Sequence, residues 1–196
     1  YRIIGGGERG AGLVTTLDSK IQKVVQTELI STGQRGAVVV VDATNGNLLA
    51  AASNPTFDPN QVESALGAPG APLLNRAIHN YYPGSVFKLV VTAAALEEKV
   101  TSTDERFFDP GYRDVGKVRF RCWLEAGHGN LNLAEGFAQS CNNVYVELGL
   151  RLGAKMVSYA EQLGLGTKTG IGLPQEESGS LPQGKFAKQD FGNMAL

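Results

Sequence analysis

Ser85 and Lys88 form the strongest chemical signal in this sequence. Pro83-Gly84 breaks regular structure just before them, and the Ala-, Leu- and Glu-rich residues that follow predict a helix from Ser85 to about Lys99. Residues three apart lie on one face of a helix, so the hydroxyl and the amine would be neighbours at its N-terminus. Burial and the positive end of the helix dipole both favour a neutral amine, which can accept a proton. A serine beside such a base is an activated nucleophile.

A second polar group, Ser140-Cys141-Asn142, lies in a predicted tight turn. Residues 131–139 and 144–152 on either side have helical spacing. A turn at this point can present a hydroxyl and a carboxamide to a cleft. Plain structural roles are the alternatives for all four candidates. Ser85 and Ser140 could cap helices, Lys88 could be a solvated first-turn residue, and Asn142 could be an ordinary turn residue.

These motifs, and several longer stretches, resemble the class B penicillin-binding proteins, which are serine D,D-transpeptidases. S-x-x-K followed by an S-x-N motif is a signature of that family and of related β-lactamases. The likeness covers nearly the whole chain and is strongest to the elongation-type penicillin-binding protein 2 group. The matching stretches are residues 17–22, 37–42, 44–46, 53–59, 75–77, 82–85, 108–111 and 128–131.

The resemblance implies a reaction and a role for each candidate residue. Ser85 would attack a peptidoglycan stem peptide at its penultimate D-alanine, and Lys88 would take the serine proton. Ser140 would relay a proton to the leaving amine, while Asn142 would hold the substrate amide. One oxyanion donor would be the backbone N–H of Ser85. β-Lactams would acylate the same serine, and no cofactor or metal is expected.

The resemblance also implies an architecture, a location and partners. The expected fold class is α+β, a penicillin-binding-protein or serine β-lactamase-like transpeptidase fold with an antiparallel sheet covered by helices and a helical subdomain. The catalytic domain would lie outside the cytoplasmic membrane of a bacterium, in the periplasm. It would be held there by an N-terminal anchor that this sequence does not include. Membrane proteins of cell elongation are the expected partners.

Lys168-Thr169-Gly170 spells the third motif of the family, but its surroundings predict a surface loop. Gly and Pro are dense from residue 164 to residue 182, which argues against the edge strand that carries the working motif. We therefore expect the catalytic strand beyond Leu196, so that the active site and the fold of this chain would be incomplete.

Composition and charge narrow the function classes. The 196 residues carry a net charge of −1 and are 42% hydrophobic, which suits a globular core and gives no indication of nucleic-acid binding. No apolar run approaches the roughly 20 residues that a membrane span needs. The sequence leaves open whether Cys122 and Cys141 form a disulfide. His79 and His128 have no metal-ligand spacing with these cysteines, so each histidine is expected to be structural.

Hydrophobic spacing and turn signals predict the remaining elements. A helix begins at Asp18 or Ser19, and Asn45-Gly46 joins two strands of a hairpin whose apolar residues predict helices on both faces. Residues 54–80 are expected to have little regular structure. The chain is predicted to be one part of a transpeptidase domain, with a linker (1–17), a helix and hairpin (18–53), and the nucleophile helix with a helical subdomain (54–196). The predicted elements are a helix to about residue 29, strands 37–42, 47–53, 113–115 and 117–121, and helices 131–139, 142–152 and 154–163.

Two other functions fit the same residues. A D,D-carboxypeptidase or a β-lactamase would use the same scaffold, but it would need a general base for deacylation, and no Glu is evidently placed for that role. A binding or scaffolding module without catalysis is the alternative from another class. Stable penicillin labelling at Ser85 would favour a transpeptidase. Rapid turnover of the label would favour a hydrolase, and the absence of labelling would favour a binding module.

Overall fold

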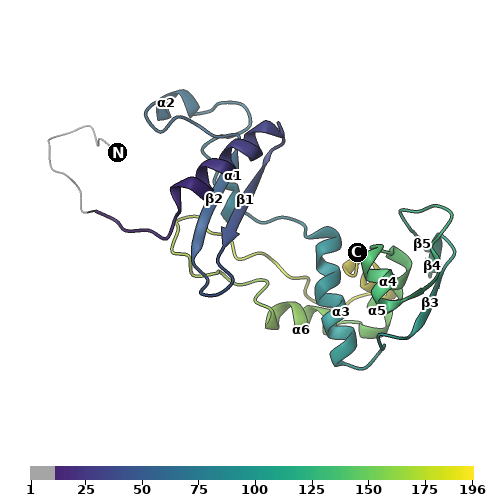
Figure 1. Cartoon of the computed structure of the whole chain (residues 1–196). Coiled ribbons are helices and arrows are strands. Elements are labelled where there is room, and N and C mark those ends of the chain that lie inside the picture. The colour runs from purple at the N-terminus through teal and green to yellow at the C-terminus, as the bar shows by residue number, and fades with distance from the viewer. Residues whose placement is uncertain (1–11) are drawn as a thin grey trace. The chain divides into compact units, whose positions relative to one another are not determined.

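A computed structural model describes residues 12–196, which form two compact units that divide between His79 and Asn80. The chain contains helices and short antiparallel strands, which come mostly in separate runs, and the ribbon in Figure 1 shows them. This content agrees with the predicted α+β class. Most of the predicted linker lies outside the described residues, and residues 12–17 have no helix or strand.

The N-terminal unit is built on α1 (Ser19–Ser31), the helix predicted from the Asp18 signal. The Asp18 carboxylate accepts hydrogen bonds from the backbone N–H groups of Lys20 (2.8 Å) and Ile21 (3.0 Å), as an N-cap should. Gln22 then donates to Ala51 O (3.0 Å) and accepts from Ala51 N (2.9 Å). A side-chain amide thus pairs with the strand backbone and fixes the helix on the hairpin.

The hairpin consists of β1 (Gly36–Val41) and β2 (Leu48–Asn54), which pair antiparallel as predicted. Helix α1 packs mainly against β2, beside which it lies in Figure 1. Three valines of β1 remain exposed: Val38, Val39 and Val41. The prediction of helices on both faces therefore does not hold for the described residues, because α1 is the one long helix in this unit.

The long segment after β2 has little regular structure, as predicted. It contains only α2 (Val62–Ala65) and the 3-10 turn η1 (Arg76–Ile78). Arg76 is buried at 8% exposure and donates to the carbonyl oxygens of Ala71 (3.1 Å) and Leu74 (3.3 Å). The guanidinium group of Arg76 thus binds several backbone carbonyl groups of a loop that has little regular secondary structure.

Helices form the core of the C-terminal unit. The 3-10 turn η2 (Gly84–Phe87) leads into α3 (Lys88–Glu97), which packs against α5 (Asn142–Leu152) and α6 (Lys155–Gln162). Their shared core contains Val91, Ala94, Tyr145, Leu148 and Met156, all 0% exposed. All three helices were predicted, but α3 begins at Lys88 rather than at Ser85, which lies on the 3-10 turn. No helix of the described residues has the length and apolar character to cross a membrane.

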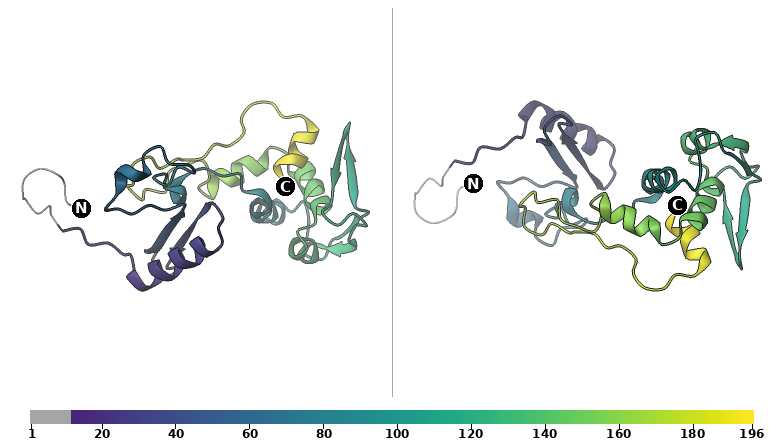
Figure 2. Two further views of the ribbon diagram at one scale, coloured as in Figure 1. Left: turned by 90° about the horizontal axis from the view of Figure 1, so that it is seen from above. Right: turned by 90° about the horizontal axis from the view of Figure 1, so that it is seen from below.

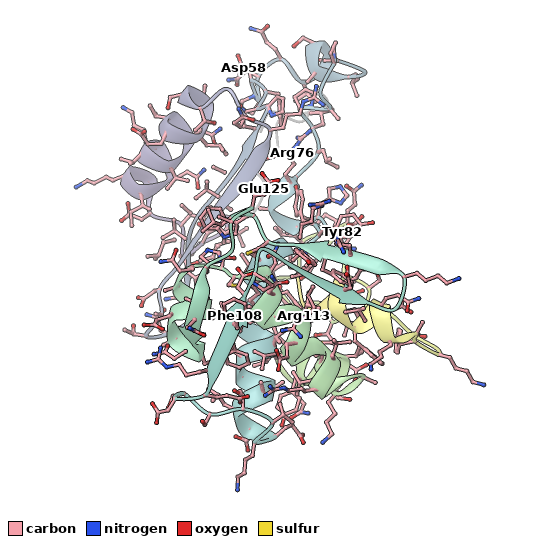
Figure 3. The ribbon with its side chains drawn as sticks, turned by 90° about the vertical axis from the view of Figure 1, so that its right-hand side faces the viewer. Asp58, Arg76, Tyr82, Phe108, Arg113 and Glu125 are labelled. Atoms are coloured by element: carbon pink, nitrogen blue, oxygen red, sulfur yellow. The ribbon has the colours of Figure 1, made fainter. Side chains whose placement is uncertain are left out.

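Two pairs of short strands flank these helices. Strands β4 (Tyr112–Val115) and β5 (Val118–Arg121) form the predicted hairpin, which lies beside the helices in both views of Figure 2 and packs on α5. Arg113, labelled in Figure 3, reaches from β4 to Glu147 on α5 at 2.6 Å. The second pair, β3 (Arg106–Asp109) with β6 (Gly129–Asn132), was not predicted.

Strand β6 replaces the start of the helix predicted at residue 131. Helix α4 (Leu133–Ala138) begins two residues later, because Asn132 and Glu135 form a capping box there. Near the end of the chain, α7 (Lys188–Met194) packs on α5 and was also missed. Short polar helices such as α7 carry little hydrophobic periodicity.

Lys168-Thr169-Gly170 lies in a loop, as predicted. The backbone N–H and the hydroxyl of Thr169 both donate to Glu176 Oε1, at 2.7 and 2.6 Å. These hydrogen bonds, the side-chain one first, lower the pKa of the Glu176 carboxyl. The triplet is part of a local loop structure and pairs with no strand in the described part of the chain.

Gly149 is predicted to be essential for the contact between α5 and α7. A Cβ at this position would lie 2.4 Å from Phe191 O and 2.7 Å from Ala195 Cβ. Gly149→Ala should therefore lower the free energy of unfolding by about 1–3 kcal/mol through overpacking, although alanine favours helix. Urea unfolding measures the effect. Gln162→Ala on α6 is the control, and equal stabilisation by both substitutions would contradict the prediction.

Candidate active site

The Lys88 side chain is the centre of the site. It is 1% exposed, and its Nζ donates to Ser140 O (2.9 Å), Ser140 Oγ (3.0 Å) and Asn142 Oδ1 (2.8 Å). Burial lowers the pKa of the Lys88 amine, while the nearby Cys141 and Cys122 act in the opposite direction. A lowered pKa increases the fraction of neutral amine that can accept a proton.

The corner formed by Ser140, Cys141 and Asn142 has a specific backbone shape. Ser140 has φ +49°, a left-handed conformation that is uncommon for a residue other than glycine. Its N–H donates to Phe137 O and the next N–H donates to Gly136 O, both at 2.9 Å, so the end of α4 holds the turn. Asn142 Nδ2 donates to Arg121 O (3.0 Å). That bond orients the carboxamide so that its oxygen faces Lys88.

Ser85 lies on η2, three residues before Lys88, and its side chain is exposed. Its backbone oxygen accepts from the N–H of Lys88. Within residues 12–196 its hydroxyl makes no hydrogen bond, so the hydroxyl is open to solvent and to a ligand. Catalytic hydrogen bonds often tighten only when substrate is bound, so this geometry is compatible with a nucleophile.

The structure thus brings three of the four predicted residues into direct contact and places the fourth one turn away. It also adds two residues that the sequence did not reveal. The Tyr145 ring lies 5.2 Å from Lys88 Nζ, and its hydroxyl is 2.6 Å from Thr92 Oγ1. Thr92 in turn donates to Lys88 O (2.7 Å). Tyr145 is three residues past Asn142, so helical spacing was the one feature of the sequence that could have placed it on the same face as Asn142.

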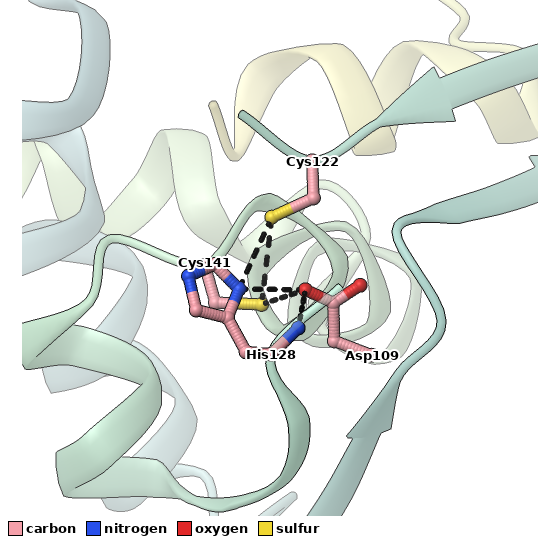
Figure 4. A group of neighbouring side chains, drawn as sticks. All are labelled: Asp109, Cys122, His128 and Cys141. Atoms are coloured by element: carbon pink, nitrogen blue, oxygen red, sulfur yellow. Dashed lines mark hydrogen bonds and ion pairs between the residues drawn. The ribbon is translucent and has the colours of Figure 1, made fainter. Parts of the chain in front are cut away.

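A second cluster of polar side chains shares Cys141 with the corner (Figure 4). Donor atoms of Asp109, Cys122, His128 and Cys141 all lie within 4.8 Å of one another, and the four side chains are almost fully buried. His128 Nδ1 is 2.7 Å from Asp109 Oδ2 and 3.4 Å from Cys122 Sγ. The two sulfur atoms are 3.9 Å apart, and both cysteines are free thiols.

This cluster has the donor set of a zinc site. Zinc bonds of about 2.0–2.3 Å in a tetrahedron place neighbouring ligand atoms about 3.3–3.8 Å apart. The separations of 3.4 and 3.9 Å above, and 3.2 Å between Cys141 Sγ and Asp109 Oδ2, are close to those values. The His128–Asp109 hydrogen bond is shorter, so that pair would have to separate slightly.

The expectation of no metal-ligand arrangement between His128 and the cysteines rested on spacing along the chain, whereas the fold brings their donor atoms together. The antiparallel pairing of β3 with β6 brings His128 next to Asp109, and the end of β5 brings Cys122. His79 belongs to the other unit and is not part of the cluster.

Comparison with known proteins identifies the family. Residues 36–195 match the family model for the penicillin binding protein transpeptidase domain, so the chain belongs to that family. It is 38% identical over 182 residues to stage V sporulation protein D of Bacillus subtilis, covering 88% of this chain and 28% of the relative. It is 32% identical over 197 residues to the peptidoglycan D,D-transpeptidase MrdA of Escherichia coli K12, covering 94% of this chain and 31% of the relative. The chain therefore spans less than a third of these relatives.

Solved structures confirm the predicted fold class. Penicillin-binding protein A of Mycobacterium tuberculosis, in a penicillin G acyl-enzyme complex, aligns with a TM-score of 0.82 and 29% identity over 92% of this chain and 46% of that one. PBP2 of Helicobacter pylori, in a complex with MreC, aligns with a TM-score of 0.80 and 30% identity over 91% of this chain and 37% of that one. The chain has the fold of part of a transpeptidase domain.

We predict that Zn²⁺ binds the Asp109 cluster. Adding Zn²⁺ to chelator-treated protein should raise the melting temperature, because metal binding stabilises the folded state. Burial raises the pKa of the Cys141 thiol to about 12, so binding must displace a thiol proton and should strengthen as pH rises. Thermal shift and elemental analysis measure both effects. His128→Ala should lose the site and His79→Ala should keep it; equal zinc content in the two variants would contradict the prediction.

Proposed function

We propose that the protein containing this chain is a serine D,D-transpeptidase that cross-links peptidoglycan. One observation carries the proposal: a buried lysine amine, held by Ser140 and Asn142, lies one turn from the exposed Ser85. Serine, amine and S-x-N corner together form an activated nucleophile with a base that a third group orients. Membership of the transpeptidase family supports this assignment.

The proposed reaction has two acyl-transfer steps. Ser85 Oγ attacks the carbonyl carbon of the penultimate D-alanine while its proton passes to Lys88. The tetrahedral intermediate collapses, the terminal D-alanine leaves as an amine, and Ser140 relays the proton from Lys88 to that amine. An amine of a second stem peptide then attacks the acyl-enzyme and forms the new amide; the bond to Ser85 Oγ breaks, and the proton lost by the amine returns through Lys88 to that oxygen. Asn142 positions Lys88 and the substrate amide throughout.

A β-lactam would enter the first step and stop before the second. The opened ring stays attached to Ser85 as an ester, and no amine leaves the site. Penicillin-binding protein A of M. tuberculosis forms acyl-enzyme complexes of this kind, which supports the proposal for its relative here. The hydrolase alternatives differ in the second step alone, where water replaces the acceptor amine.

Location and partners follow from the same proposal. Stem peptides are cross-linked outside the cytoplasmic membrane, so the catalytic domain would lie there. The H. pylori PBP2–MreC complex supports proteins of the cell-elongation machinery as partners. The similarity to a sporulation protein leaves sporulation as a second setting, in which the same chemistry would apply.

Penicillin labelling tests the function. The full-length protein should bind fluorescent penicillin stably, and Ser85→Ala should lose at least about 99% of the labelling, because the nucleophile is gone. Ser158→Ala, on the exposed side of α6, is the matched control and should label normally. Rapid loss of label from the wild type would indicate a hydrolase. A folded full-length protein that is never labelled would indicate a binding module.

The pH dependence of acylation tests the role of Lys88. The neutral amine is the reactive form and its pKa is lowered, so the rate should rise with pH through a midpoint below the usual lysine value of 10.5. Asn142→Asp would put a carboxylate where the amide oxygen lies 2.8 Å from Nζ. That charge should raise the lysine pKa and move the midpoint up by about 1 unit or more.

The matched substitution for this experiment is Asn142→Ala. It removes the acceptor without adding charge, so the rate should fall with no alkaline shift of the midpoint. Stopped-flow measurement of the acylation rate between pH 5 and 10 gives the pH profile of each variant. A lysine with a perturbed pKa titrates within about this range. A midpoint that is the same in the aspartate and alanine variants would rule out Lys88 as the base.

A further inference from the structure

Successive residues of the catalytic corner face opposite sides. Ser140 and Asn142 contact the amine of Lys88. The residues that alternate with them, Cys141 and Asn143, both donate to the carboxylate of Asp109. The corner therefore lies between a buried amine on one side and a buried carboxylate on the other.

Asp109 is well suited to hold this corner rigidly. It is 1% exposed, and its Oδ1 accepts from Gly111 N (2.7 Å) and from Asn143. Its Oδ2 accepts from His128 N (3.1 Å), His128 Nδ1 (2.7 Å) and Cys141 Sγ (3.2 Å), the bonds visible in part in Figure 4. Burial acts to raise the pKa of Asp109, but the hydrogen bonds from His128, Asn143 and Gly111 outweigh it and hold the pKa well below its usual value.

The corner needs such a support because its conformation is strained. A left-handed φ at Ser140 persists only where the surroundings over-determine it. The hydrogen bonds to α4 hold the backbone of Ser140 and Cys141, and Asp109 holds the side chains of Cys141 and Asn143. For Asn143 the bond to Asp109 is its single side-chain hydrogen bond among the described residues.

We propose that Asp109 is a positioning residue for the active site: through Cys141 and Asn143 it fixes Ser140 and Asn142 against Lys88. The inference rests on the transpeptidase function proposed above. It holds with or without metal, because a zinc ion on Asp109 and Cys141 would replace one hydrogen bond of the same link. Asn143 donates to Oδ1 of Asp109, whereas Cys141 donates to Oδ2. A zinc ion bound through Oδ2 would therefore leave the hydrogen bond from Asn143 in place.

The test separates the acylation step from penicillin binding in the full-length protein, with a chelator present. Cys141→Ala and Asn143→Ala should each lower the acylation rate constant about tenfold or more, since a displaced corner misplaces the proton-transfer groups. The dissociation constant of the initial penicillin complex should change less than about threefold, because binding precedes proton transfer. Cys141→Ser restores a donor to Asp109 and should keep the rate constant within about threefold of the wild type.

Val146→Ala is the control for stability alone. Val146 is 0% exposed on α5 and packs in a separate buried cluster with Val115 and Phe120. This variant should lose thermal stability and keep its acylation rate constant. If Cys141→Ala does not fold, Asn143→Ala and Cys141→Ser still give the comparison.

The two proposals fail in different ways. Wild-type rate constants in folded Cys141→Ala or Asn143→Ala would overturn the role of Asp109 alone. A rate loss in Val146→Ala as large as theirs would do the same, since stability would then explain every variant. A wild-type protein that does not become acylated at Ser85 would refute the proposed function, and this inference with it.

Discussion

The burial of the Lys88 amine is the constraint on which the site depends. A buried ammonium without partners costs several kcal/mol, so the protein must either supply acceptors or favour the neutral form. The corner at residues 140–142 supplies three acceptors within 3.0 Å, and burial favours the neutral form. The two effects oppose each other, which keeps the amine able to gain and to lose a proton. A fully exposed lysine would remain protonated, and one without acceptors would have no fixed position.

This constraint explains why polar groups gather in the middle of an apolar helical core. Each acceptor of Lys88 is itself held: Asn142 by Arg121 O, and the Ser140 backbone by the end of α4. Behind them the buried Asp109 carboxylate accepts five hydrogen bonds. Partly satisfied buried networks are costly, and two buried atoms of this one, Asn143 Oδ1 and His128 Nε2, have no hydrogen-bond partner among the described residues.

The sequence revealed the parts of the site that depend on local spacing. Ser85 and Lys88 share one turn, and the corner residues share another, so motif and helix period were sufficient for them. Asp109, His128 and Cys122 could not be found this way. They meet because β3 pairs with β6, and four-residue strands carry too little alternation to predict their partners. The start of α4 was misplaced for the same reason, since the strand β6 ends where the cap at Asn132 begins.

The Lys168-Thr169-Gly170 loop demonstrates how far a motif can be trusted without its structural setting. In a substrate-binding strand the threonine hydroxyl and the neighbouring backbone groups must be available to a ligand. Here both donors of Thr169 are bound to Glu176, which is itself buried at 8% exposure. Releasing them would leave the Glu176 carboxylate without the hydrogen bonds that hold it in the loop, which is unfavourable. The same three letters therefore stabilise a loop here, whereas Ser85, with its hydroxyl unbonded and a buried amine one turn away, keeps the groups that chemistry requires.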